Sequence, residues 1–148
     1  MNPVALSIVL MIAGGAAFAL QAPTNAKLAT GLMSPVNAAL VSFIVGGVAL
    51  AILAMAQGAR PDWTATRGLP AWVWTGGFYG ALAVGATVYA TPRIGVTTAL
   101  TLAVAAQLAT ALAVDHFGWL GAEVRPVSAI KLLGVAVVAA GVFLVRKG

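Results

Sequence analysis

The sequence predicts an all-α membrane protein with five transmembrane helices, and two observations carry that prediction. Of its 148 residues, 61% are hydrophobic and only 7% are charged, whereas soluble domains carry about a quarter charged residues. The charged residues also leave five long gaps, at residues 1–26, 28–59, 68–92, 94–114 and 132–145. Four gaps exceed the roughly 20 residues needed to cross a bilayer. The fifth is long enough if Lys131 lies in the first helical turn and extends its ammonium to the interface.

Turn and capping residues place the helices at about 3–30, 35–57, 70–90, 95–114 and 126–145, in a single transmembrane domain over residues 1–148. Ser34 is a suitable N-cap for the second helix, with Pro35 at its first position. The third helix opens at Pro70 and the fifth at Pro126, while the fourth stops at the DHFG segment. No Lys or Arg precedes the first span, so we expect it to be retained rather than removed as a signal peptide.

Basic residues are balanced between the two membrane faces. The face of the N-terminus carries Arg60, Arg67, Arg125 and Lys131, and the other carries Lys27, Arg93, Arg146 and Lys147. A clear excess on one side normally fixes orientation, so this balance predicts insertion both ways. Five helices are few for a transport path, and a second, inverted copy would complete a ten-helix antiparallel dimer. The alternative is a weak bias that one dominant loop resolves.

The first helix carries unexpected polar residues near its end. Gln21 and Asn25 lie four residues apart on one helical face, with Pro23 between them. Amides are costly in hydrocarbon unless they are paired, and proline removes a backbone hydrogen bond. We therefore expect an interrupted or bent helix whose amides face a cavity at the dimer interface, with Gln107 or its copy, a ligand or water as partner. The alternative is an ordinary helix end in the headgroup region.

The fourth helix supplies the next polar candidates. Gln107 lies about midway along it, and Asp115 lies eight residues on, roughly on the same face. Gln107 is a candidate ligand-binding residue, although such a residue also serves as a bond between helices. Asp115 and His116 are candidates for proton coupling, but at a helix end they can equally stay hydrated.

The third helix is rich in small residues. Gly76, Gly77, Gly80 and Gly85 recur at spacings that allow close helix approach, so they are candidates for helix packing or the dimer interface. Ser42 and Tyr79 are weaker candidates for substrate binding; an aromatic residue near a helix end more often belongs to the interfacial belt.

Several function classes find no support in the sequence. No Asp or Glu lies in the middle of a span, there is no cysteine, and no nucleotide-binding, metalloprotease or catalytic-triad pattern is present. We therefore expect neither an enzyme nor a bound metal or cofactor. The net charge of +5 is spread over loops and helix ends, which is typical of membrane anchoring rather than of nucleic-acid binding.

The order of these motifs resembles the YdcZ-like family of small membrane proteins, a branch of the drug/metabolite transporter superfamily. The resemblance rests on Gly14 with Gly15, Gln21 with Asn25, the segments at 34–46, 76–80, 115–118 and 132–142, and Gln107. It departs at Ala106, where the family usually has glycine. The resemblance implies a five-helix inner-membrane exporter that works as an antiparallel dimer, of one chain or of two paired chains.

These observations predict a small dual-topology secondary transporter, an exporter of small molecules that works by alternating access as an antiparallel homodimer in the bacterial inner membrane. Its partners would be an inverted copy of itself, membrane lipids and a small molecule that the sequence does not name. The alternatives are a dual-topology ion channel and a membrane assembly protein that transports nothing.

Overall fold

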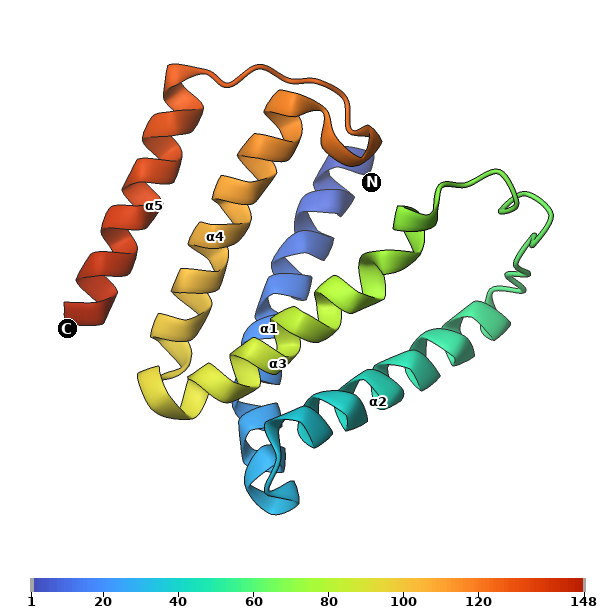
Figure 1. Cartoon of the computed structure of the whole chain (residues 1–148), viewed down its shortest axis with the longest axis horizontal. Coiled ribbons are helices and arrows are strands. Elements are labelled where there is room, and N and C mark those ends of the chain that lie inside the picture. The colour runs from blue at the N-terminus through green and yellow to red at the C-terminus, as the bar shows by residue number, and fades with distance from the viewer. Residues whose placement is uncertain (1, 148) are drawn as a thin grey trace. The chain divides into compact units, whose positions relative to one another are not determined.

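The computed structural model describes residues 2–147, and this part of the chain is entirely helical apart from its connections (Figure 1). The elements are α1 (Pro3–Leu32), α2 (Pro35–Ala56), the 3-10 helix η1 (Ala71–Thr75), α3 (Gly76–Ile94), α4 (Val96–Phe117), the short η2 (Trp119–Gly121) and α5 (Ala129–Lys147). The prediction of an all-helical chain is confirmed.

Four helices within residues 2–147, namely α1, α2, α4 and α5, are long and apolar enough to cross a membrane. The third predicted span is weaker. Its first turns form η1 rather than α-helix, and the 19-residue α3 contains glycines, two tyrosines and Arg93, which lower its hydropathy. The count of five spans therefore stays a prediction for α3.

Local capping explains where the helices begin and end. Ser34 Oγ accepts a hydrogen bond from the Asn37 amide at 3.2 Å, and Pro35 follows, as predicted. The fifth helix begins at Ala129 rather than at Pro126, since Ser128 Oγ accepts from the Lys131 amide at 3.3 Å. The fourth continues to Phe117, three residues beyond its predicted end, and stops where Gly118 adopts φ 64°.

The connection between α2 and α3 is tied by one carboxylate. Asp62 Oδ1 accepts hydrogen bonds from the Thr64 hydroxyl at 2.6 Å and from the amides of Thr64 and Ala65 at 3.0 and 3.3 Å. These bonds favour the charged form, with the Thr64 side chain contributing most, so they hold the pKa of Asp62 below its ordinary value.

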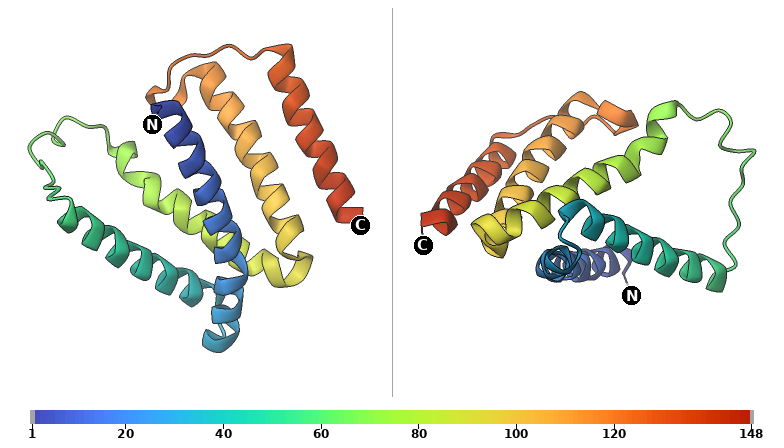
Figure 2. Two further views of the ribbon diagram at one scale, coloured as in Figure 1. Left: turned by 180° about the vertical axis from the view of Figure 1, so that it is seen from behind. Right: turned by 60° about the horizontal axis from the view of Figure 1, so that its bottom comes forward.

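The chain divides into two compact units, one up to Pro92 and the other from Arg93. In the first unit, small residues of α1, α2 and α3 form a core: Ala29, Ala38, Ala39, Val84 and Val88, with Leu28 packed against it. In the second unit, α4 and α5 lie side by side (Figure 2). Only Ala99 is buried among the helical residues described there.

The cores are small because most apolar side chains face outward. Ala38 and Val88 are almost completely buried, but long runs of Leu, Ile and Val on every membrane-length helix are exposed. A water-soluble monomer rarely leaves such large apolar patches uncovered. These surfaces must therefore be covered by lipid or by another protein chain.

We expect Gly118→Ala to destabilise the second unit. A non-glycine residue in the left-handed region costs roughly 1–2 kcal/mol, and a Cβ at Gly118 would lie only 2.7 Å from Val124 Cγ2. The melting temperature in bicelles should fall, and adding Val124→Ala should recover part of the loss. The matched control is Gly141→Ala, at a position with open space around the added Cβ. Equal melting temperatures for the two glycine variants would contradict the expectation.

Candidate functional site

The two amides of α1 meet one hydroxyl on α2. Gln21 Nε2 donates to Ser42 Oγ at 3.2 Å, and Asn25 Nδ2 donates to the same oxygen at 3.1 Å. A serine hydroxyl has two acceptor lone pairs, so Ser42 receives one hydrogen bond from each amide. The structure thus brings together three of the predicted binding residues, and the partner that it gives both amides is Ser42. The pairing with Gln107 stays a prediction.

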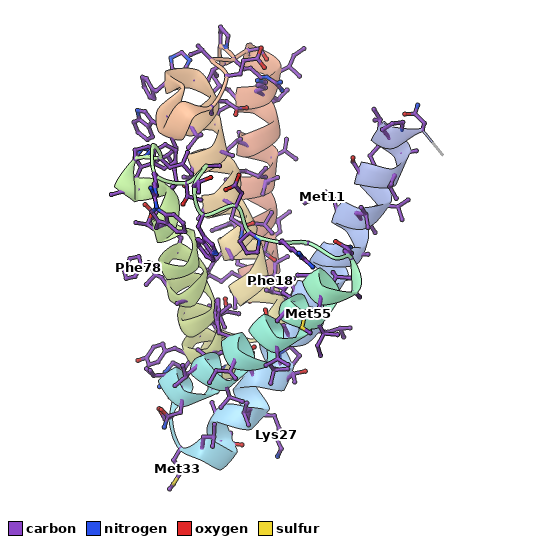
Figure 3. The ribbon with its side chains drawn as sticks, turned by 90° about the vertical axis from the view of Figure 1, so that its right-hand side faces the viewer. Met11, Phe18, Lys27, Met33, Met55 and Phe78 are labelled. Atoms are coloured by element: carbon purple, nitrogen blue, oxygen red, sulfur yellow. The ribbon has the colours of Figure 1, made fainter. Side chains whose placement is uncertain are left out.

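These groups lie inside the first unit rather than at a solvated helix end. Asn25 is only 5% exposed, and Gln21 and Ser42 are partly buried. By contrast, Lys27 is exposed and points outward (Figure 3). Burial of an amide is costly without hydrogen bonds, which explains why both amides turn toward the one hydroxyl that α2 offers.

The first helix is not interrupted at Pro23. It is continuous from Pro3 to Leu32 with Pro23 inside it, so of the two expected forms, interrupted or bent, the interrupted one does not occur. The ribbon of α1 instead changes direction in its C-terminal part (Figure 2). Proline removes the N–H that would bond the carbonyl four residues earlier, which weakens a helix locally without ending it.

A narrow crevice adjoins the amides. Its walls are Phe18, Gln21, Ala22 and Asn25 from α1 and Val84, Thr87 and Val88 from α3 (Phe18 is labelled in Figure 3). About 170 Å³ of unfilled space, part of it open to the outside, adjoins these residues, and none of it is wide enough for a water molecule. The site is therefore closed in this conformation.

The crevice has spare hydrogen-bond acceptors. Within residues 2–147, the side-chain oxygens of Gln21 and Asn25 accept no hydrogen bond, since only their nitrogens are engaged. Thr87 uses its hydroxyl hydrogen on the carbonyl of Ala83 at 2.8 Å, so its free lone pairs also accept. The site can therefore receive N–H or O–H donors without any charged group of its own.

Thr87 was missed by the sequence analysis, as were Val84 and Val88. Their spacing of three and four residues places them on one face of α3, which was the available signal. The same face continues to Thr91, which is 6% exposed and whose Oγ1 has no hydrogen-bond partner in the described chain. Two hydroxyls thus lie on the inward face of a helix for which the sequence analysis had named only the glycines and Tyr79.

The other candidates on α3 do not join this site. Tyr79 is more than half exposed, and its ring meets Phe78 edge-on at 6.2 Å. A Cβ at Gly80 would lie 3.2 Å from the ring of Phe43, so this glycine lets α2 approach. A Cβ built at Gly76, Gly77 or Gly85 would meet nothing within 4 Å among residues 2–147. The predicted role of these three glycines in helix packing or at a dimer interface stays a prediction.

The remaining candidates lie in the second unit. Gln107 is exposed on α4. Asp115 and His116 occupy the last turn of α4, where the Arg125 amide donates to the Asp115 carbonyl at 2.7 Å and the Val127 amide donates to His116 Nδ1 at 3.4 Å. These contacts hold the connection to α5 in place. The predicted role of both residues in proton coupling is not tested by this geometry.

A family comparison agrees with the membrane character of the chain. The family model described as "Putative inner membrane exporter, YdcZ" matches residues 6–144. The chain belongs to this family. It is therefore a multi-pass inner-membrane protein, and the resemblance drawn from the sequence is confirmed.

Comparisons with curated proteins and with solved structures give no significant match. Residues 2–147 contain no group of three or more His, Cys, Asp or Glu side chains that could hold a metal ion. The chemistry available at the candidate site of this family member is thus hydrogen bonding by uncharged side chains.

We expect Ser42→Ala to destabilise the first unit by about 1–3 kcal/mol, because it leaves buried amide groups without their partner. Thermal unfolding in bicelles measures the loss. Ser7→Ala is the matched control, since Ser7 is exposed and its hydroxyl bonds only to the carbonyl of Pro3. In a double-mutant cycle, Asn25→Ala and Ser42→Ala should couple by about 0.5–3 kcal/mol. Additive effects would show that the shared hydrogen bond contributes nothing.

Proposed function

We propose that this chain exports small molecules across the bacterial inner membrane as an antiparallel homodimer that works by alternating access. Each copy would contribute Gln21, Asn25 and Ser42 to a central path, with Gln107 lining it from α4. The observation that carries the proposal is the convergence of one buried and one partly buried amide on one hydroxyl, with their oxygens left free beside a crevice.

The free oxygens favour ligand binding over simple helix adhesion. Neither oxygen is among the buried, unpaired side-chain atoms of residues 2–147, so a donor from outside the protein can reach both. Each amide donates one N–H to Ser42 Oγ, and its side-chain oxygen remains free to accept a hydrogen bond. Polar groups retained at this cost in membrane helices commonly mark a substrate path. A ligand that donates N–H or O–H groups would complete the set.

The closed crevice supports a moving site. Since no water molecule fits between Phe18, Asn25 and the Val84–Val88 face of α3, a ligand enters only if α1 and α3 separate. The walls contributed by α3 are small side chains, and Gly80 meets α2 through the edge of one ring. Such contacts can separate without breaking an ion pair, which suits a carrier whose site opens alternately to the two sides of the membrane.

The dimer proposal rests on the charge balance and on uncovered surface. Four Lys or Arg residues belong to each predicted face, and that balance allows both orientations. In the single chain, Gln107 is exposed, and Gly76, Gly77 and Gly85 leave open space beside α3. An inverted copy would cover these surfaces and bring a second set of polar residues toward the path.

Transport should depend on Gln21. We expect Gln21→Leu to fold and dimerise nearly normally, because leucine is favourable in hydrocarbon, while binding weakens about tenfold as one or two hydrogen bonds to the ligand are lost. Proteoliposomes loaded with a panel of amines, guanidines, amides and polyols measure the flux.

The control for this test is Thr24→Leu on the exposed face of α1, where the hydroxyl bonds only to the Leu20 carbonyl. Unchanged transport by Gln21→Leu would remove the site from the mechanism. Ion flux far faster than a rocking carrier allows would favour the channel, and absence of flux for every solute would favour an assembly protein.

The inverted arrangement has its own test. The chain has no cysteine, so a single cysteine added at either terminus gives labelling without background. In intact cells, a membrane-impermeant maleimide should label about half of each variant, because both orientations would be present. If each terminus is labelled from one side only, the homodimer cannot be antiparallel, and a parallel oligomer or a paired homologous chain must replace it.

A further inference from the structure

A second, larger hollow lies within the α4–α5 unit. It is a groove of about 390 Å³ between the two helices, with Asp115 and Lys131 among its lining residues. Its other walls are apolar and include Leu108 and Leu112 on α4 and Gly134 and Val135 on α5. The volume falls within the roughly 300–1,000 Å³ typical of small-ligand sites. Unlike the crevice beside Gln21, this groove is open.

The groove is charged at one end and apolar along the rest. Asp115 lies in the last turn of α4 and Lys131 in the first turns of α5, so both charges belong to the end where the helices are connected. Leu108 lies seven residues before Asp115 on the same face, about 10 Å along the axis. Since α4 and α5 both have the length and hydropathy of membrane spans, the charged end belongs at a membrane interface and the apolar part in hydrocarbon.

The two charges are not neutralised by each other. Within the described chain, neither Asp115 nor Lys131 forms an ion pair, although both line the same groove. The nearby Arg125 is already paired with Glu123 at 2.9 Å. The groove therefore offers one cation without an ion pair, Lys131, and one anion without an ion pair, Asp115.

We propose that this groove binds one molecule of a zwitterionic phospholipid whose headgroup carries a primary ammonium, that is, a phosphatidylethanolamine. Its phosphate would meet the Lys131 ammonium, its ammonium would donate to the Asp115 carboxylate, and one acyl chain would lie along Leu108, Leu112 and Val135. The match is one of charge: the groove offers one cation and one anion above an apolar wall. Phosphatidylglycerol offers Asp115 only uncharged hydroxyl donors and no cation, and the methylated headgroup of phosphatidylcholine has no N–H to donate.

Native mass spectrometry tests the headgroup preference. The full chain is equilibrated in mixed micelles with equimolar dioleoyl phosphatidylethanolamine, phosphatidylglycerol and phosphatidylcholine, which differ only in the headgroup. We expect phosphatidylethanolamine to be retained at least about threefold over the others, since only its headgroup can bring an N–H-donating cation to Asp115 while its phosphate meets Lys131. Asp115→Asn should abolish this preference, and Lys131→Gln should lower retention of all three lipids, because each carries the same phosphate group.

A groove-filling variant separates specific binding from the general lipid coat. A Cβ at Gly134 meets nothing within 4 Å, so Gly134→Leu can occupy the groove without disturbing the backbone. It should lower phosphatidylethanolamine retention at least twofold. Gly141→Leu on the same helix, also with open space, and Arg146→Gln at the far end of α5 are the controls and should retain the lipid as the parent does.

Three outcomes would overturn the proposal: equal retention of the three lipids by the parent chain, full retention by Gly134→Leu, or disulfide formation between Gly134→Cys chains in native membranes. The last would place a second copy over the groove. Circular dichroism of each variant confirms that it is folded. The readout is lipid retention and requires no transport, so it stands or falls independently of the exporter proposal.

Discussion

The shared acceptor at Ser42 is the interaction around which the first unit is organised. Two amides one helical turn apart on α1 reach the same oxygen on α2, which fixes both the rotation of α1 about its axis and its register against α2. In a core made of alanine and valine, side-chain shape alone would specify that register weakly. Hydrogen bonds supply the missing specificity, as polar residues commonly do between membrane helices.

The same contact explains why the site is held together and still has hydrogen-bond acceptors without donors. An acceptor that takes two N–H groups leaves two amide oxygens without donors, so the arrangement has a surplus of acceptors beside Thr87. No titratable side chain lines this crevice. Under the proposed function, recognition there would depend on hydrogen-bond direction and size rather than on charge, and the charged groups of the chain belong to its connections and helix ends instead.

The sequence was most informative where one residue decides the outcome locally. Ser34 and Pro35 correctly predicted the start of α2, and the amides of α1 indicated a polar site. It was less informative about exact helix ends: Ser128, not Pro126, caps α5, and α4 continues past its predicted end until Gly118 stops it. The role of Ser42 as a common acceptor depends on how two helices are rotated against each other across 17 and 21 residues of sequence, which no local pattern encodes. Pro23 predicted an interrupted or a bent helix without deciding between them, because a proline that ends a helix in water can be carried inside one that is held by its neighbours.

The low hydropathy of α3 affects how this segment is inserted into the membrane during synthesis. If α3 crosses the bilayer, its glycines, tyrosines and Arg93 give it little tendency to leave the insertion machinery for lipid by itself. The α1–α2 hairpin emerges first during synthesis and already presents Ala29, Ala38 and Ala39, against which Val84 and Val88 of α3 pack. The third segment would then enter the membrane on a protein surface rather than in lipid, so a defect in the hairpin would appear first as failed biogenesis and only later as failed transport.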